Sequence, residues 1–366
     1  MKFAEYYDKV HGGWLGRVVG SQLGAPLEFL PFKYTQWKYC DKGTKEIDYY
    51  IKKPNPQAVN DDEIYEILGL LALEEKGVNI TSKDIAQHWD EKLYKAQYTA
   101  EKAALKNIRK GIFPPDSASN DNGNFWYDAI GGQMKADIWG LIAPGCPKIA
   151  AKYAEIDGSV AHQGVGIDGE LYLAAIVANT FETSDLPTLI QQSLEVLPLE
   201  SEYRIFVEKC IQIAEKYPNW RNGRKKMVEE WNIIRTQLRS EAKSWRRRRL
   251  FLKYFHGVHV LPNAGIIVLS LLYGANDKKD PFGRPICIAG MMAMDTDCNC
   301  GNIGTIMGTL YGADKIPKKW TKPLRDEFHT YVKGHEDWKI SELSDRIAKI
   351  GVKVMKAKCP EKSITE

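Results

Sequence analysis

Apolar residues recur at helical spacing along most of the chain, and no stretch alternates apolar and polar residues for long. After Asp62, for example, Ile64, Ile67 and Leu68 fall on one face of a helix. The pattern therefore predicts a mainly α-helical protein. Helices are expected at residues 3–24, 63–77, 82–97, 99–110, 147–155, 166–179, 186–197, 202–217, 263–274 and in several segments between 296 and 355, with loops or short irregular strands at 31–56 and a loop at 117–124.

Two of these helices carry glycine at every fourth position. Four-residue spacing places the glycines on one face of each helix. Glycine inside a helix costs roughly 1 kcal/mol relative to alanine, so each stripe predicts close approach of another backbone. We expect the two helices to pack against each other. The glycines are Gly12, Gly16, Gly20 and Gly24 in the first helix, and Gly304, Gly308 and Gly312 in the second.

Carboxylates stand at the breaks beside the apolar helices. Packing of the two glycine stripes would bring acids from both ends of the chain together, and such a cluster is strongly unfavourable without cations. Carboxylate ligands suit Mg²⁺ or Mn²⁺, and two ions sharing bridging carboxylates would balance most of the charge. For either stripe alone, ordinary helix packing with the acids as helix caps is an equally good explanation. The five acids are Glu28, Asp61, Asp62, Asp295 and Asp297.

Length and composition are those of a globular protein. The 366 residues, with 44% hydrophobic and 27% charged side chains, allow one large domain or two ordinary ones. No internal repeat or low-complexity linker divides the sequence, so we expect a single domain over residues 1–366. A net charge of +4 says little about partners.

The sequence predicts a cytoplasmic protein with no membrane segment. Charges at Lys2, Glu5 and Asp8 interrupt the apolar run that a secretion signal needs, and no apolar run reaches the roughly 18 residues of a membrane span. The seven cysteines are odd in number and include no CxxC pair, so reduced thiols are the expected state.

A basic segment, residues 221–249, carries eleven Lys or Arg against three Glu and ends in the run Arg246–Arg249. It could contact an anion or a nucleic acid. Charge runs more often form a solvated face, so we favour an outer helix or a helical insertion and consider a nucleic-acid partner unlikely.

Three motifs together resemble the ADP-ribosylglycohydrolases, the family that includes the enzyme reactivating dinitrogenase reductase. They are GxxxGxxxGxxLGAPLE ending at Glu28, the pair Asp61-Asp62, and DTD at Asp295 followed by its glycine helix. Their order and spacing match over nearly the whole chain. The resemblance implies a compact, orthogonal all-α bundle with a dinuclear magnesium site that hydrolyses the bond at the anomeric carbon of a ribosyl group.

The resemblance also assigns roles to residues. Two positions depart from the family, which has threonine where this chain has Asn60 and Cys298; an asparagine carbonyl suits a hard ion, whereas a thiol is a poor Mg²⁺ ligand. The expected metal ligands are Asn60, Asp61, Asp62, Asp295, Asp297 and Cys298; the catalytic carboxylates are Glu28 and Asp62; the substrate-binding residues are Gly131, Gly132, His162 and Trp126.

In the expected mechanism, the ions bind ribosyl hydroxyls and orient a water, and Asp62 or Glu28 takes its proton. The expected substrate is an ADP-ribosylated protein. The altered signatures keep two alternatives open: the same chemistry on a small ribonucleoside or nucleotide, and a non-catalytic structural protein like a lens crystallin that resembles the family.

Aromatic and histidine side chains offer weaker candidates. Trp126, Tyr127 and Trp139 could stack on a nucleobase, although such residues more often lie in the core. His162 is either a substrate contact or a structural histidine. We interpret His256 and His259 as structural, because the sequence places no acid near them.

Overall fold

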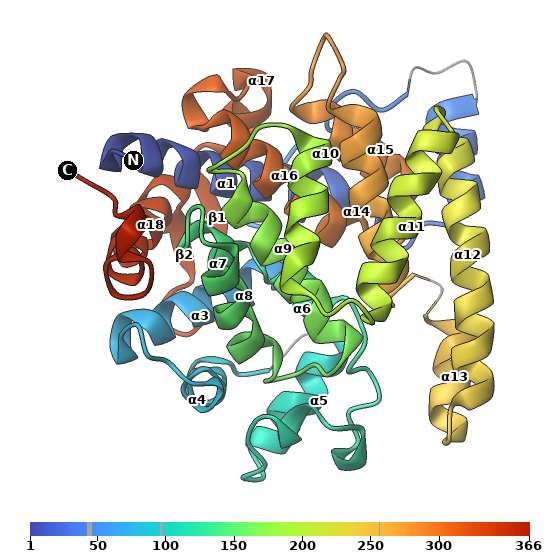
Figure 1. Cartoon of the computed structure of the whole chain (residues 1–366), viewed down its shortest axis with the longest axis horizontal. Coiled ribbons are helices and arrows are strands. Elements are labelled where there is room, and N and C mark those ends of the chain that lie inside the picture. The colour runs from blue at the N-terminus through green and yellow to red at the C-terminus, as the bar shows by residue number, and fades with distance from the viewer. Residues whose placement is uncertain (42–45, 96–97, 256) are drawn as a thin grey trace.

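A computed structural model of the chain describes residues 1–41, 46–95, 98–255 and 257–366. Helices dominate these residues, as the sequence predicts (Figure 1). They are α1 Phe3–Gly24, α2 Phe32–Gln36, α3 Asp61–Lys76, α4 Ser82–Lys92, α5 Thr99–Ile108, α6 Gly131–Met134, α7 Asp137–Leu141, α8 Pro147–Gly158, α9 Val165–Asn179, α10 Leu186–Gln192, α11 Glu202–Lys216, α12 Trp220–Glu241, α13 Trp245–Lys253, α14 Val260–Gly274, α15 Gly283–Met292, α16 Thr296–Tyr311, α17 Lys318–Thr321 and α18 Ile340–Lys358.

The two glycine-striped helices, α1 and α16, pack antiparallel at the centre of the fold, as predicted. A Cβ atom added to Gly16 would collide with the carbonyl oxygen of Gly304, and one added to Gly304 would collide with that of Gly16. Gly12 and Gly308 are related in the same way. The missing side chains therefore allow backbone-to-backbone contact between the two ends of the chain.

Apolar helices surround this pair. Helix α14 is buried along nearly its whole length and packs on α11, α12, α15 and α16. A helix that is apolar on every side belongs in a protein interior. Helices α12 and α13 lie along one edge of the molecule, and α18 lies on the opposite side (Figure 1).

Several boundaries differ from the sequence predictions. The segment 31–56 contains α2 and a π-helical turn at Trp37–Asp41. Helix α4 ends at Lys92, and the last two residues of the predicted 82–97 helix lie outside the described part of the chain. Residues 117–124 form short 3-10 turns.

The C-terminal region contains strands where only helices were expected. Strand β1 (Glu327–His329) pairs antiparallel with β2 (Asp337–Lys339), with Phe328 opposite Trp338. Arg325 and Asp326, directly before β1, have φ angles of 58° and 60°. Two successive left-handed residues turn the chain out of a helical path, which helical periodicity does not reveal.

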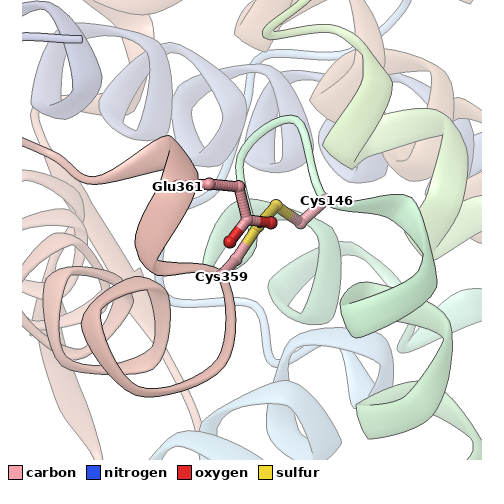
Figure 2. Close-up of side chains that lie close together, drawn as sticks. All are labelled: Cys146, Cys359 and Glu361. Carbon is pink, nitrogen blue, oxygen red and sulfur yellow. A yellow bond between two sulfur atoms is a disulfide. The ribbon is translucent and has the colours of Figure 1, made fainter.

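The prediction of reduced thiols throughout is wrong, because Cys146 and Cys359 form a disulfide (Figure 2). The bond joins the residue that precedes α8 to the residue that follows α18. Glu361 lies beside it, with Oε1 3.1 Å from Cys359 Sγ. Spacing could not indicate this pair, since 213 residues separate the two cysteines.

The basic segment is helical but not simply solvated. It forms α12 and α13, which are separated at Ser244, the N-cap of α13. Arg247 is buried and paired with Asp128, and buried Arg224 donates a 2.6 Å hydrogen bond to the carbonyl of Met292. The expectation of a solvated face is therefore wrong for these two arginines. No helix in the described ranges is long and apolar enough to cross a membrane.

Candidate active site

The predicted acids gather at the starts of two helices. Asn60 caps α3, its Oδ1 accepting a 2.9 Å hydrogen bond from the backbone N–H of Asp62. Asp295 precedes α16, and Asp297 lies in its first turn. Negative charge is favoured there by the helix dipole, which is why the sequence tolerates acids beside apolar helices.

Glu28 lies at the same site, and a backbone turn directly after it sets its position. Phe29, directly after it, has φ 52°, and Ala293 and Met294, directly before Asp295, have φ 63° and 77°. The N–H of Phe29 donates a 3.0 Å hydrogen bond to the carbonyl of Met294. Left-handed non-glycine residues cost roughly 1–3 kcal/mol each and concentrate at functional sites. This hydrogen bond joins the two strained turns. It fixes the positions of Glu28, directly before Phe29, and of Asp295, directly after Met294.

A pocket of about 210 Å³ opens onto this cluster. Glu28, Asn60, Asp61 and Asp297 all line it, whereas the more buried Asp62 and Asp295 do not. A larger cavity, about 450 Å³, lies near the other end of α16 and holds none of these acids. The smaller pocket is therefore the one at the predicted acids, and Tyr98 and Tyr331 also line it.

Burial and mutual repulsion disfavour the ionised acids. Burial, followed by the charge of Asp297, raises the pKa of Glu28 to about 7 and that of Asp61 to about 8. Burial raises the pKa of Asp62 well above the usual range, although the charge of Arg17 lowers it, and burial with the charge of Asp297 does the same for Asp295. Such a cluster attracts either protons or cations.

The available oxygens fit a hard divalent ion. Asp295 Oδ1 and Asp297 Oδ1 are buried without a hydrogen-bond partner. One ligand atom each from Asp295, Asp297 and Cys298 lie within 4.8 Å of one another. Carboxylate oxygens suit Mg²⁺ or Mn²⁺. The structure thus brings two of the predicted acids, Asp295 and Asp297, together with Cys298 in a donor set that an ion could use.

Three predicted ligands are engaged by the protein itself. Besides capping α3, Asn60 places Nδ2 3.4 Å from Asp297 Oδ2. The thiol of Cys298 donates to Asp62 Oδ1 over 3.2 Å. Burial, together with the charges of Asp295 and Asp62, raises the pKa of this thiol well above its usual value, so it stays protonated. Asn60 and Cys298 therefore form hydrogen bonds with Asp62 and Asp297.

Arg17 is a member of the site that the sequence reasoning missed. Its fully buried guanidinium lies 3.2 Å from Asp62 Oδ2, 3.4 Å from Glu66 Oε1 and 2.9 Å from Asp137 Oδ2. The contact with Asp62 is an ion pair without hydrogen-bond alignment. The available signal was an arginine directly after Gly16, on a helix that the glycine stripe already placed in the interior.

The substrate-side predictions gather around another missed acid, Glu101. His162 is buried, with Nε2 2.8 Å from Glu101 Oε1 and Nδ1 3.2 Å from the carbonyl of Tyr127. A Cβ atom on Gly131 would collide with Glu101 and lie 2.8 Å from His162 Nε2. Gly132 packs against the carbonyl of Gly166. Both glycines are thus required by packing, and their contact with substrate stays a prediction, as does that of His162.

The aromatic candidates divide between core and surface. Trp139 is fully buried and stacks on Tyr153, so it is a core residue. Trp126 is partly exposed and packs edge-on against Tyr254 and Phe255. Stacking of Trp126 on a substrate base stays a prediction.

The prediction that His259 has no nearby acid is wrong, because its Nε2 lies 3.5 Å from Asp128 Oδ2. His256 lies outside the described residues. The acid could not be found from spacing, since Asp128 lies far from His259 in the sequence and reaches it only in the folded chain.

The fold and the pocket define a helical protein with an acidic site where α1, α3 and α16 meet. Residues 3–353 match the family model described as ADP-ribosylglycohydrolase, so the chain belongs to that family. A solved structure titled "ADP-ribosylglycohydrolase-related protein complex" is similar at a TM-score of 0.59 and 16% identity, over 96% of this chain and 100% of that chain. At this identity the likeness shows the shared fold alone. No curated protein matches the sequence.

Proposed function

We propose that this protein hydrolyses the bond at the anomeric carbon of an ADP-ribosyl group in a reaction that depends on divalent metal. One observation carries the proposal: in a chain of this family, acids from both ends of the sequence meet at one pocket with unpartnered buried oxygens. A structural protein would gain nothing from such a cluster, because buried, unpaired carboxylates lower stability.

Mg²⁺ is the proposed cofactor, and Mn²⁺ can replace it. Asp61, Asp295 and Asp297 are the residues that would hold an ion, and Glu28 lies beside them in the pocket. When bound, it would supply Lewis-acid chemistry, binding hydroxyls of the ribosyl group and lowering the pKa of a water. The sequence predicts two ions. The second ion would need Asp62 as a ligand.

Glu28 is our choice for the base that takes a proton from the attacking water. It lines the pocket, is only partly buried, and its pKa, raised to about 7 by burial and then by Asp297, suits proton transfer near neutral pH. The alternative, Asp62, is completely buried and already engaged by Cys298 and Arg17. The remaining carboxylates favour the positive charge that develops on the ribosyl ring.

The size of the pocket keeps a second substrate class open. Sites for drug-sized ligands usually measure roughly 300–1,000 Å³, whereas this pocket measures about 210 Å³. It suits a ribosyl group, and the rest of an ADP-ribosylated protein would lie outside it. A small ribonucleoside or nucleotide acted on by the same residues is therefore the second candidate.

The test is product release from defined substrates. We expect Mg²⁺-dependent release of ADP-ribose from an ADP-ribosylated protein, abolished by chelation and by Glu28→Gln. Release of ribose from free nucleosides, with no action on modified protein, would instead establish the second candidate. Absence of both activities in metal-loaded, folded protein would reject the proposal.

We retain the cytoplasm as the proposed location. The disulfide weighs against it, because disulfides are rare in reducing compartments. Alkylation of the protein while cells are lysed in denaturant tests the location: because Cys146 and Cys359 are buried in the folded chain, only unfolding exposes them, and labelling of both as free thiols is expected for a cytoplasmic protein.

A further inference from the structure

Asp62 differs from the other four acids of the site in having a fixed cation beside it. Arg17 Nη2 is 3.2 Å from Asp62 Oδ2, and both side chains are completely or almost completely buried. Burial lowers the pKa of Arg17, but the negative charges of Glu66, Asp137 and Asp62 outweigh it and raise that pKa above its usual value. The guanidinium is therefore a permanent positive charge.

Arg17 cannot move away to admit another cation. Its second nitrogen, Nη1, donates a 2.9 Å hydrogen bond to Asp137, and Nη2 donates to the carbonyl of Met134. Asp137 is held in turn by Thr305, over 2.5 Å. Helices α1, α3, α7 and α16 meet at this cluster, so the arginine is fixed by contacts on several sides.

The other oxygen of Asp62 is also engaged. Cys298 donates its thiol proton to Asp62 Oδ1 over 3.2 Å. The carbonyl oxygen of Asn60, a hard ligand that the sequence assigned to an ion, accepts the backbone N–H of Asp62 over 2.9 Å. Asn60 and Cys298 thus form hydrogen bonds with Asp62, and Asn60 caps the start of α3.

Asp62 Oδ2 also accepts no hydrogen bond, but it faces the guanidinium of Arg17, whereas no ion pair with a described residue reaches the other four acids. Asp295 Oδ1 and Asp297 Oδ1 are buried without partners, and Glu28 and Asp61 face the pocket. Mg²⁺ takes about six oxygen ligands and keeps several waters. Asp61, Asp295 and Asp297, with waters, satisfy one such ion. A second ion would require the three ligands that the protein has already engaged, beside a fixed guanidinium that repels it.

We propose that Asp62 is not an ion ligand and that this site holds a single divalent ion, bound by Asp61, Asp295 and Asp297. Arg17 occupies the place beside Asp62 that a second ion would need. This inference rests on the proposed metal dependence and specifies the number of ions.

Titration of the full chain with Mn²⁺, with free ion measured by electron paramagnetic resonance, tests the proposal. The wild type is expected to bind one Mn²⁺ per chain at saturation. Asp62→Asn should still bind one, with affinity within about threefold of wild type, whereas the matched change Asp297→Asn should weaken binding at least as much as the 10–100-fold typical of lost supporting contacts. Circular dichroism melting confirms that each variant is folded.

Crystals grown with Mn²⁺ keep the test independent of the variants. One anomalous peak is expected, with both oxygens of Asp62 outside its coordination shell. Two bound ions, an Asp62 oxygen in the shell, or loss of the ion in folded Asp62→Asn would overturn this inference and leave the proposed function standing. No bound ion in any measurement would overturn both.

Discussion

Buried charges in this protein are held in small clusters. Besides the Arg17 cluster, Lys135 Nζ lies 2.8 Å from Asp157 and 3.3 Å from Glu170, with all three side chains fully buried. Arg247 pairs with Asp128 in the same manner. Removing one partner from a buried pair costs about 3–5 kcal/mol, because it leaves an uncompensated charge. Single residues in these clusters should therefore have large and separable effects.

The thiol of Cys298 provides the first prediction. Cys298→Ser keeps a donor for Asp62 and replaces soft sulfur with oxygen. Because the thiol already donates to Asp62, we expect Mn²⁺ and Cd²⁺ affinities within about threefold of wild type, as for a residue outside the ligand set. Isothermal titration with each ion measures this, and Cys287→Ser, at a buried free cysteine on α15, is the control. A selective loss of Cd²⁺ affinity in Cys298→Ser would show that sulfur binds the ion.

Asp128 provides a prediction about acid stability. Burial would raise the pKa of Asp128, but hydrogen bonds and charge from Arg247 and His259 outweigh it and hold that pKa below its usual range. A depressed folded pKa stabilises the protein above the unfolded value, about 3.9, and this contribution is lost as pH falls further. Asp128→Asn should lower the free energy of unfolding at pH 7 by about 3–5 kcal/mol.

The same variant should lose less stability than wild type between pH 4 and pH 2, since it has no carboxylate to protonate. Urea denaturation across this pH range measures both effects. Parallel pH profiles for the two proteins would contradict the role given to the Arg247 pair. Asp116→Asn, which leaves Asp128 and its partners unchanged, serves as the control.

At the scale of elements, contact between α1 and α16 decides where the acids go. A Cβ atom added to Gly20 would collide with the carbonyl oxygen of Cys300. One added to Gly24 would collide with that of Thr296. The stripe therefore continues to the start of α16 and brings Glu28, just beyond α1, to Asp297. Backbone contact, in place of side-chain packing, sets the distance between these acids.

Gly16→Ala tests this contact. The added methyl group would collide with backbone atoms of Gly304, which cannot move as a side chain can. Overpacking a core costs about 1–3 kcal/mol, and more where backbone must shift. Thermal melting should show a large loss, together with weaker Mn²⁺ binding. At Gly257 an added Cβ would meet its nearest neighbours at 3.7–3.9 Å, so Gly257→Ala should be tolerated. Equal effects of the two changes would contradict the role of the stripe.

At the scale of the whole molecule, the disulfide ties the C-terminal helix to the middle of the chain. Both cysteines are buried, and α18 also packs against α1 (Figures 1 and 2). A covalent bond that closes a long loop restricts the unfolded chain more than the folded one. The disulfide should therefore contribute to stability without touching the pocket.

The prediction for the whole molecule concerns the loss of this disulfide. Replacing both Cys146 and Cys359 with alanine should lower the free energy of unfolding by about 2–5 kcal/mol. Chemical denaturation measures the loss. A dithiol reductant should have the same effect on wild type and none on the double variant, and Mn²⁺ stoichiometry should be unchanged. Equal stability of wild type and variant would show that the bond is not formed in solution.

The sequence by itself determined the local structure of this protein. Helical periodicity gave the apolar helices, glycine spacing predicted that α1 and α16 touch, and acids at helix starts marked the candidate site. These signals are local, because each depends on residues within a few turns of one helix. Two stripes of the same spacing were enough to predict one long-range contact.

Only the tertiary structure decided the partners of the buried charges. Arg17 meets Asp137 across 120 residues, His162 meets Glu101 across 61, and Cys146 meets Cys359 across 213. No periodic pattern connects such residues, since ion pairs and disulfides depend on where side chains end after the helices have packed. For this reason the sequence could place Asp62 in the site, whereas the fold gave it an arginine.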